Sequence, residues 1–305
     1  MSRALSTYLD GLRVLAALWV FLGHVSLLLP AAGLPPLWWT AEDAVMGFFV
    51  LSGFVIAYTA EHRHATLRDY AAARLARLWS VAVPALVFAF VVDRIGRALA
   101  PELAPGLVPD WMEPDPLGRL LAGLVFVNEL WFGSLRAPSN VPYWSIGYEA
   151  WYYVLFGCAV YLRGARRAAA LVVAALIAGP KILLLVPVWL MGVAAWRVAG
   201  RIPPAVGWIL VAGSIVAYFA AWALGVRPGL AWRAALLTPS GIDLAWSTEF
   251  LWKFLVGAMA AANLAGFAAI SRGLSLGAVE RPVAWLAGMS FSLYLFHWPL
   301  LLLVD

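Results

Sequence analysis

Apolar runs close to twenty residues long, separated by short segments rich in Pro and Gly, make up most of this chain. The runs lie at about 9–29, 43–60, 75–95, 142–162, 168–186, 187–199, 204–225, 247–270 and 282–304, and a shorter one lies at 117–133. About 20 apolar residues in a helix span the hydrocarbon core of a bilayer. Only 12% of the residues are charged, about half the share in soluble domains. We therefore expect an all-α protein, a polytopic transmembrane helical bundle of about nine to ten spans.

The runs follow one another without a soluble segment, so we expect residues 1–305 to form one integral membrane domain. The N-terminal run is similar to a signal peptide, but it is long, carries Arg13 and His24, and is followed by further spans. We therefore predict an uncleaved first helix. The run at 187–199 is short for a full span. It is predicted to pair tightly with its predecessor, to tilt, or to be broken.

The distribution of Arg and Lys predicts the orientation, because cytoplasmic loops carry more of these residues. The basic residues before the first span and after the second are Arg3, Arg63, Arg68, Arg74 and Arg77. The loop at 30–42 has no Lys or Arg and 99–116 is acidic, so we expect both outside. If 117–133 does not cross fully, the arginines that move to the cytoplasmic side are Arg163, Arg166, Arg167, Arg197, Arg201, Arg272 and Arg281. We therefore predict nine crossings, a cytoplasmic N-terminus and an outward C-terminus.

Two polar residues of the first run, Arg13 and His24, are separated by ten residues. On an α-helix this spacing is about three turns, so both side chains leave from nearly the same face, roughly 16 Å apart. Charged and titratable groups inside a membrane helix usually mark a function. The alternative is structural: Arg13 extends to the headgroups and His24 caps the far end of the helix.

Arg74 and Arg77, in ARLARLW, lie one helical turn apart at the inner mouth of the third span. Two guanidinium groups at this spacing suit phosphate oxygens, although plain membrane anchoring explains most such arginines. In FFVLSGF, the small pair Ser52-Gly53 lies in mid-span and favours close approach between two helices.

The segment PSNVPYWSIGYEAWYY contains Asn140 and places Ser145 and Glu149 at i and i+4. An ionised carboxylate in this apolar run needs a partner, and His24, predicted at a comparable depth, is the natural one. In SFSLYLFHWP, the residues Ser290, Tyr294 and His297 form one polar stripe on an apolar helix.

In this order, the motifs Arg13-X10-His24, FFVLSGF, Arg74-x-x-Arg77, WSIGYEAWYY and SFSLYLFHWP resemble the landmarks of the membrane acyltransferase 3 family over nearly the whole chain. The resemblance implies an integral enzyme of the bacterial inner (plasma) membrane. It implies transfer of an acyl group, often acetyl, from cytoplasmic acyl-CoA to a hydroxyl of an extracytoplasmic carbohydrate or a small glycosylated acceptor. From composition, we expect membrane lipid as a partner and no nucleic acid, because the arginines behind the net charge of +5 cluster between the apolar runs.

The resemblance makes His24 the catalytic histidine and Arg13 its companion, assigns Arg74 and Arg77 to the CoA phosphates, and matches Glu149 to the family's acid. A base with a pKa near the operating pH suits proton removal from a hydroxyl, and Glu149 would orient its imidazole. Four residues are candidates for stabilising the oxyanion, namely Ser52, Ser145, Asn140 and Tyr294. His297 either takes part in catalysis or forms a plain hydrogen bond within the bundle. Direct transfer and an acyl-enzyme both stay open; we favour direct transfer, because no Cys or Ser stands beside a base in the sequence.

The chain departs from the family pattern at two places, of which the second bears on completeness. Met46 stands where many members have an acidic residue, and Asp43 lies one turn earlier. Many members also continue into one more span ending in Glu-x-Pro, so this chain is either a short member or a truncated one. We expect no metal, because no His, Asp and Glu cluster has ligand spacing.

Two other functions compete with acyl transfer. Buried Arg, His and Glu also serve the pathways of transporters and flippases, and an inactive family member would keep the motifs. A site with arginines at the inner mouth and a His–Glu pair near the outer face favours an enzyme. The absence of an internal repeat in the sequence points the same way.

Overall fold

The computed structural model describes residues 1–99 and 115–304, and these residues form helices and loops without a β-strand. The predicted all-α class is therefore confirmed. Six helical segments in the described part are long and apolar enough to cross a bilayer: Arg3–Leu28, Trp38–His62, Leu67–Gly96, Pro180–Ala199, Pro204–Ala223 and Phe250–Gly273. Most of the acidic segment at 99–116, predicted to face outward, lies outside the described residues.

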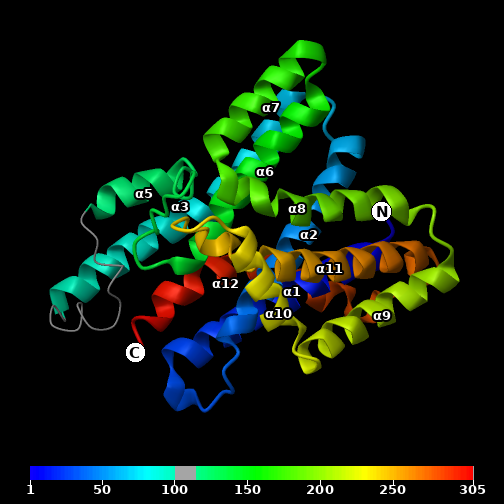
Figure 1. Ribbon diagram of the computed structural model, residues 1–305. Helices are drawn as coiled ribbons and strands as arrows, with labels where there is room; N and C mark the ends of the chain where they lie inside the picture. The colour runs from blue at the N-terminus through cyan, green and yellow to red at the C-terminus, as the bar shows by residue number, and fades with distance from the viewer. Residues whose placement is uncertain (100–114, 305) are drawn as a thin grey trace. The chain divides into compact units, whose positions relative to one another are not determined.

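The helices follow the predicted runs closely (Figure 1). They are α1 (Arg3–Leu28), α2 (Ala41–His62), α3 (Leu67–Leu99), α5 (Pro116–Leu124), α6 (Trp144–Tyr161), α7 (Gly164–Ala178), α8 (Pro180–Ala199), α9 (Pro204–Ala223), α10 (Val226–Leu237), α11 (Phe250–Ile270) and α12 (Gly277–Leu301). Short 3-10 helices occur at Pro30–Ala32, Trp38–Thr40, Val141–Tyr143, Ala245–Ser247 and Ser271–Gly273.

The boundary between α7 and α8 corrects the predicted division at 186/187. Helix α7 ends before Gly179, whose φ of 80° disfavours any residue with a side chain. Pro180 then opens α8, where its fixed φ suits the first turn and its missing N–H costs no hydrogen bond. Pro187 lies inside α8, so 187–199 is the second part of one 20-residue helix. The segment is therefore not a short run of its own.

Two shorter helices test the rest of the prediction. Helix α5 has nine residues, about 13 Å of length, so the prediction that 117–133 does not form a full spanning helix is confirmed. Asp115 caps α5 by accepting a hydrogen bond from the Gly118 N–H at 2.7 Å.

Helix α10, with 12 residues, was not predicted. Its arginines and Gly229 interrupt the apolar pattern on which the prediction relied.

The chain divides into two compact units. Unit one comprises Met1–Leu18, Glu42–Ala65 and Leu183–Ser290, and unit two comprises Trp19–Ala41, Thr66–Ile182 and Phe291–Asp305. Helices α1, α8 and α12 contribute residues to both units, as does α2 through its first residue, Ala41.

In unit one, helices approach each other through their backbones. A Cβ at Gly192 of α8 would overlap the carbonyl oxygen of Val50 in α2, and one at Gly53 would overlap the carbonyl oxygen of Trp189. The indole N–H of Trp189 also donates to the Ser52 hydroxyl at 3.1 Å. The prediction that Ser52-Gly53 marks a close helix contact is therefore confirmed.

Helices α9 and α11 of unit one lie side by side (Figure 1). Asn263 of α11 donates to the Val211 carbonyl and the Ser214 hydroxyl of α9, and it accepts a hydrogen bond from Tyr8 at 2.6 Å. One buried amide thus joins α1, α9 and α11.

Asp43, the residue one turn before Met46, is buried and accepts hydrogen bonds from the side chains of Trp252 and Tyr218.

In unit two, α6 packs against α3 and α7, and side chains satisfy the loop that follows α5. Tyr143 donates to the Gly123 carbonyl, Trp79 to that of Leu124 and Trp151 to that of Phe126. Backbone carbonyls of a loop need such partners when water is excluded. These three bonds hold the end of α5 against α3 and α6.

Candidate functional site

A pair of histidines from opposite ends of the sequence meets in unit two. His24 Nδ1 in α1 lies 2.7 Å from His297 Nε2 in α12, and the two rings stack with centroids 5.0 Å apart. His24 is half-buried whereas His297 is only 2% exposed. Trp298 packs edge-on against the His24 ring, with centroids 4.7 Å apart. The site therefore contains one partly exposed imidazole, that of His24, stacked on a buried imidazole, that of His297.

The hydrogen bonds assign the protons of this pair. His297 Nδ1 lies 3.0 Å from the Leu293 carbonyl oxygen, which can only accept, so this nitrogen carries the proton. In a neutral His297, Nε2 then has the lone pair and accepts a hydrogen bond from His24 Nδ1–H. This arrangement leaves His24 Nε2 unprotonated and able to take a proton.

Glu149 has a different partner from the predicted one. Its carboxylate accepts a hydrogen bond from the Tyr153 hydroxyl at 2.6 Å, one turn further along α6. The predicted contact between His24 and Glu149 is wrong, because within the described residues His24 bonds to His297 and Glu149 to Tyr153. A neighbour at i+4 reaches a carboxylate without any tertiary contact.

Tyr153 also connects Glu149 to the arginines of α3. The Arg74 guanidinium lies over the rings of Tyr153 and Tyr70, 5.9 Å from each centroid. Tyr70 donates in turn to the Tyr153 carbonyl at 3.0 Å. Arg74, Tyr153 and Glu149 thus form one cluster, in which the arginine is held by ring faces.

Arg77, one turn after Arg74, is exposed and lies 5.6 Å from the ring centroid of Phe291 in α12. A cation–π contact leaves the N–H donors of a guanidinium in its own plane, where they remain able to bind an oxyanion. The predicted pair of arginines is therefore present on one end of α3, supported by aromatic rings.

Two predicted residues belong to unit one. Arg13 forms an ion pair with Asp10 at 2.7 Å, three residues earlier in α1. Ser52 accepts the indole hydrogen bond of Trp189 described above. Both have a structural contact, and neither belongs to the same unit as His24.

The remaining candidates form a hydroxyl network in unit two. The Ser145 and Tyr294 hydroxyls lie 2.8 Å apart, and each also lies within 3.2 Å of the Pro142 carbonyl oxygen. Two hydroxyls have two protons, so these contacts use both of them. Asn140 donates to the Leu295 carbonyl at 2.8 Å, and its own carbonyl oxygen has no partner among the described residues. Asn140 and Tyr294 thereby tie the loop before α6 to the helix that carries His297.

Two buried polar groups beside the loop after α5 were not predicted from the sequence. Lys181 and Glu129 form an ion pair at 3.2 Å with both side chains fully buried, and Ser134 donates to the same carboxylate. Asn128 is 1% exposed and neither polar atom of its amide has a partner in the described part. The signal was available, since Asn-Glu interrupts the apolar run at 117–133.

The described residues contain no group of three His, Cys, Asp or Glu side chains that could hold a metal ion. The site is therefore built from imidazoles, a guanidinium pair, a carboxylate and hydroxyls. These groups can move a proton and bind an anion.

Comparison with known proteins supplies the family. No curated protein and no solved structure matches the chain. A family model described as an acyltransferase domain matches residues 6–305. The chain therefore belongs to the acyltransferase 3 family, whose members are membrane acyltransferases.

Proposed function

We propose that this chain is an O-acyltransferase that moves an acyl group, in the first instance acetyl, from cytoplasmic acyl-CoA to a hydroxyl of an extracytoplasmic carbohydrate or glycoconjugate. The observation that supports this function most is the histidine pair. Its hydrogen bonds run from His24 through His297 to the Leu293 carbonyl and leave His24 Nε2 with a lone pair. Such a nitrogen is the group that hydroxyl deprotonation requires.

In the proposed reaction, His24 Nε2 takes the proton of the acceptor hydroxyl while its oxygen attacks the thioester carbonyl. The C–S bond then breaks, and the CoA sulfur leaves with the proton that His24 holds. His297 supports His24 by accepting the Nδ1–H hydrogen bond, the position that a carboxylate takes in a hydrolytic triad. Direct transfer needs no nucleophilic side chain.

The donor side is assigned to the end of α3. Arg74 and Arg77 would bind phosphate oxygens of acyl-CoA, since their guanidinium groups rest on rings and keep N–H donors in plane. Glu149 would hold this cluster through Tyr153. Arg13 is assigned a supporting part in the same reaction.

We also propose that the protein resides in the bacterial inner membrane, with a cytoplasmic N-terminus and nine crossings. The distribution of arginine supports this topology, and cysteine accessibility of single-Cys variants on both sides of 117–133 tests it.

The decisive experiment compares wild type with His24→Ala in membrane vesicles supplied with labelled acetyl-CoA and cell-envelope glycan. Loss of a general base typically lowers the rate by about 10²–10⁴-fold, so we expect transfer to fall in that range while membrane insertion is unchanged. His64→Ala, a histidine outside the site, serves as the control and keeps its activity. Full transfer by His24→Ala would refute the role of His24. Comparing surface polysaccharides by mass spectrometry with and without the gene identifies the acceptor.

A further inference from the structure

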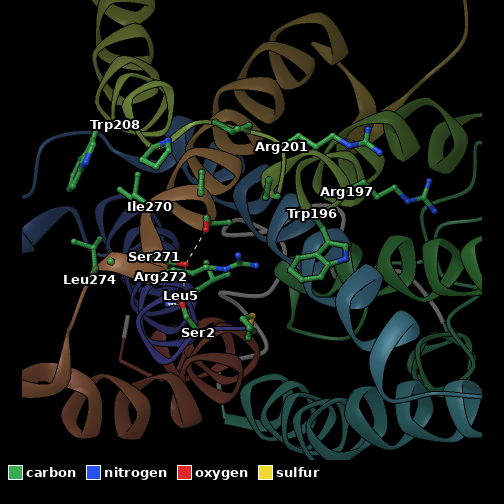
Figure 2. A pocket seen from close by; sticks show the side chains of 18 of the residues that line it. Ser2, Leu5, Trp196, Arg197, Arg201, Trp208, Ile270, Ser271, Arg272 and Leu274 are labelled. Carbon is green, nitrogen blue, oxygen red and sulfur yellow. Dashed lines mark hydrogen bonds between the residues drawn. The ribbon is translucent and has the colours of Figure 1, made fainter.

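A cavity of about 1420 Å³ lies in unit one, where α2, α8 and α11 end and α9 begins. Three arginines line it, namely Arg197, Arg201 and Arg272 (Figure 2). Trp196 and Trp208 add aromatic surface to the lining. The cavity is larger than the roughly 300–1,000 Å³ of a typical small-molecule site, so it has room for more than a single small ion.

The charge of this cavity is strongly positive. Arg197, Arg201 and Arg272 are exposed and form no ion pair with a described residue. The one carboxylate of the lining belongs to Glu61, and it accepts the indole hydrogen bond of Trp196 at 2.7 Å. Three guanidinium groups are thus opposed by one carboxylate, which already has a hydrogen bond. A concave wall of one sign attracts ligands of the opposite sign.

The hydroxyl groups of the cavity do not compete as donors. Ser2 Oγ donates to Ser271 Oγ at 2.9 Å, and Ser271 Oγ donates to the Ala268 carbonyl at 3.0 Å (Figure 2). Each hydroxyl proton is therefore used within the protein. The cationic side-chain donors of the lining are the guanidinium groups, which match planar or tetrahedral oxyanions through two parallel N–H bonds.

Membrane topology alone does not account for this arrangement. The positive-inside tendency explains why arginines occur at the ends of spans. It explains Arg166 at the start of α7 equally well, yet Arg166 does not line the cavity. Topology gives no reason why three arginines from two separate segments border one cavity beside two tryptophans.

We propose that this cavity is a binding site for a phosphate ester, in which Arg197, Arg201 and Arg272 bind the phosphate and Trp196 and Trp208 contact the organic part. This chemistry has two sources in a cell, the headgroup of an anionic phospholipid and the phosphates of CoA. The cavity lining includes neither His24 nor His297, and the proposal does not rest on the proposed acyl transfer.

The test uses the full chain, purified into nanodiscs of phosphatidylcholine, with CoA and phosphatidylglycerol as separate probes. Arg197→Gln, Arg201→Gln and Arg272→Gln are compared with wild type, and Arg166→Gln is the matched control. Removing one charge-assisted hydrogen bond to the phosphate should raise the apparent Kd by about tenfold, and Arg166→Gln should leave the Kd unchanged. Thermal unfolding shows that each variant is folded, and the three single variants provide independent tests.

The two probes distinguish the source. Weakened binding of CoA alone assigns the site to coenzyme phosphates, and weakened binding of phosphatidylglycerol alone assigns it to a lipid headgroup. The proposal is overturned if wild type binds neither probe, if the three cavity variants bind both probes as tightly as wild type, or if Arg166→Gln weakens binding as much as the cavity variants do.

Discussion

In unit one, α2 and α8 touch through their backbones at Gly53 and Gly192, whereas in unit two, side chains of the site bond to backbone carbonyls. The Leu293 carbonyl holds His297, and the Pro142 carbonyl holds Tyr294. Backbone contact between helices is rigid and has no chemistry of its own. Hydrogen bonds between side chains set protons and charges. We therefore expect substitutions at the α2–α8 backbone contact to act on folding, and those at the histidine pair and at the arginines of α3 to act on activity.

The largest expected effect is on folding. Gly192→Ala places a Cβ onto the Val50 carbonyl oxygen, so we expect a loss of about 3 kcal/mol or more in the free energy of unfolding. Gly213→Ala is the matched control, because a Cβ there meets nothing within 4 Å. It should gain up to about 1 kcal/mol from helix propensity. Thermal unfolding in detergent measures both, and equal midpoints would contradict the close contact of α2 and α8.

The next effect is on turnover and distinguishes support from packing at His297. His297→Leu removes the acceptor for His24 Nδ1–H, so kcat should fall on the order of 10²-fold. His297→Gln retains an acceptor oxygen and should recover part of that loss. The KM for acyl-CoA should not change in either variant. If His297→Leu and His297→Gln have the same kcat, His297 acts by packing alone.

A smaller effect is expected at the donor side. Arg74→Ala combined with Arg77→Ala should raise the KM for acyl-CoA about tenfold, roughly 1.4 kcal/mol, and leave the KM for the acceptor unchanged. Arg68→Ala, an exposed arginine on the same helix, is the control. An unchanged dependence on acyl-CoA would leave Arg74 and Arg77 as membrane anchors only.

The smallest effect separates the two contacts of Tyr153. Tyr153→Phe keeps the ring under Arg74 and removes the hydroxyl that donates to Glu149. We expect a stability loss of about 1 kcal/mol and a KM for acyl-CoA within twofold of wild type. Tyr153→Leu removes the ring as well and should raise this KM further. Equal KM values in the two variants would argue against a role of the ring in holding Arg74.

Several features of the site were predictable because their signals are local. The tyrosine at i+4 from Glu149 was visible as the last residue of EAWYY, and it proved to be the partner of the carboxylate. Depth in the membrane pointed to His24 instead, but depth ranks residues along the membrane normal and does not say which helix faces which. The break at Gly179-Pro180 was also visible, although continuous hydropathy across it suggested a later boundary.

The sequence by itself determined that this chain is a bundle of membrane helices of the acyltransferase 3 family, because apolar length and the order of the motifs are properties of the chain alone. It also selected His24 and His297, because a polar group in an apolar run is costly and therefore conspicuous. Only the tertiary structure decided that these two histidines meet, since they are 273 positions apart in the sequence. Contacts at that separation depend on how helices pack, and packing follows from the shapes of many side chains together.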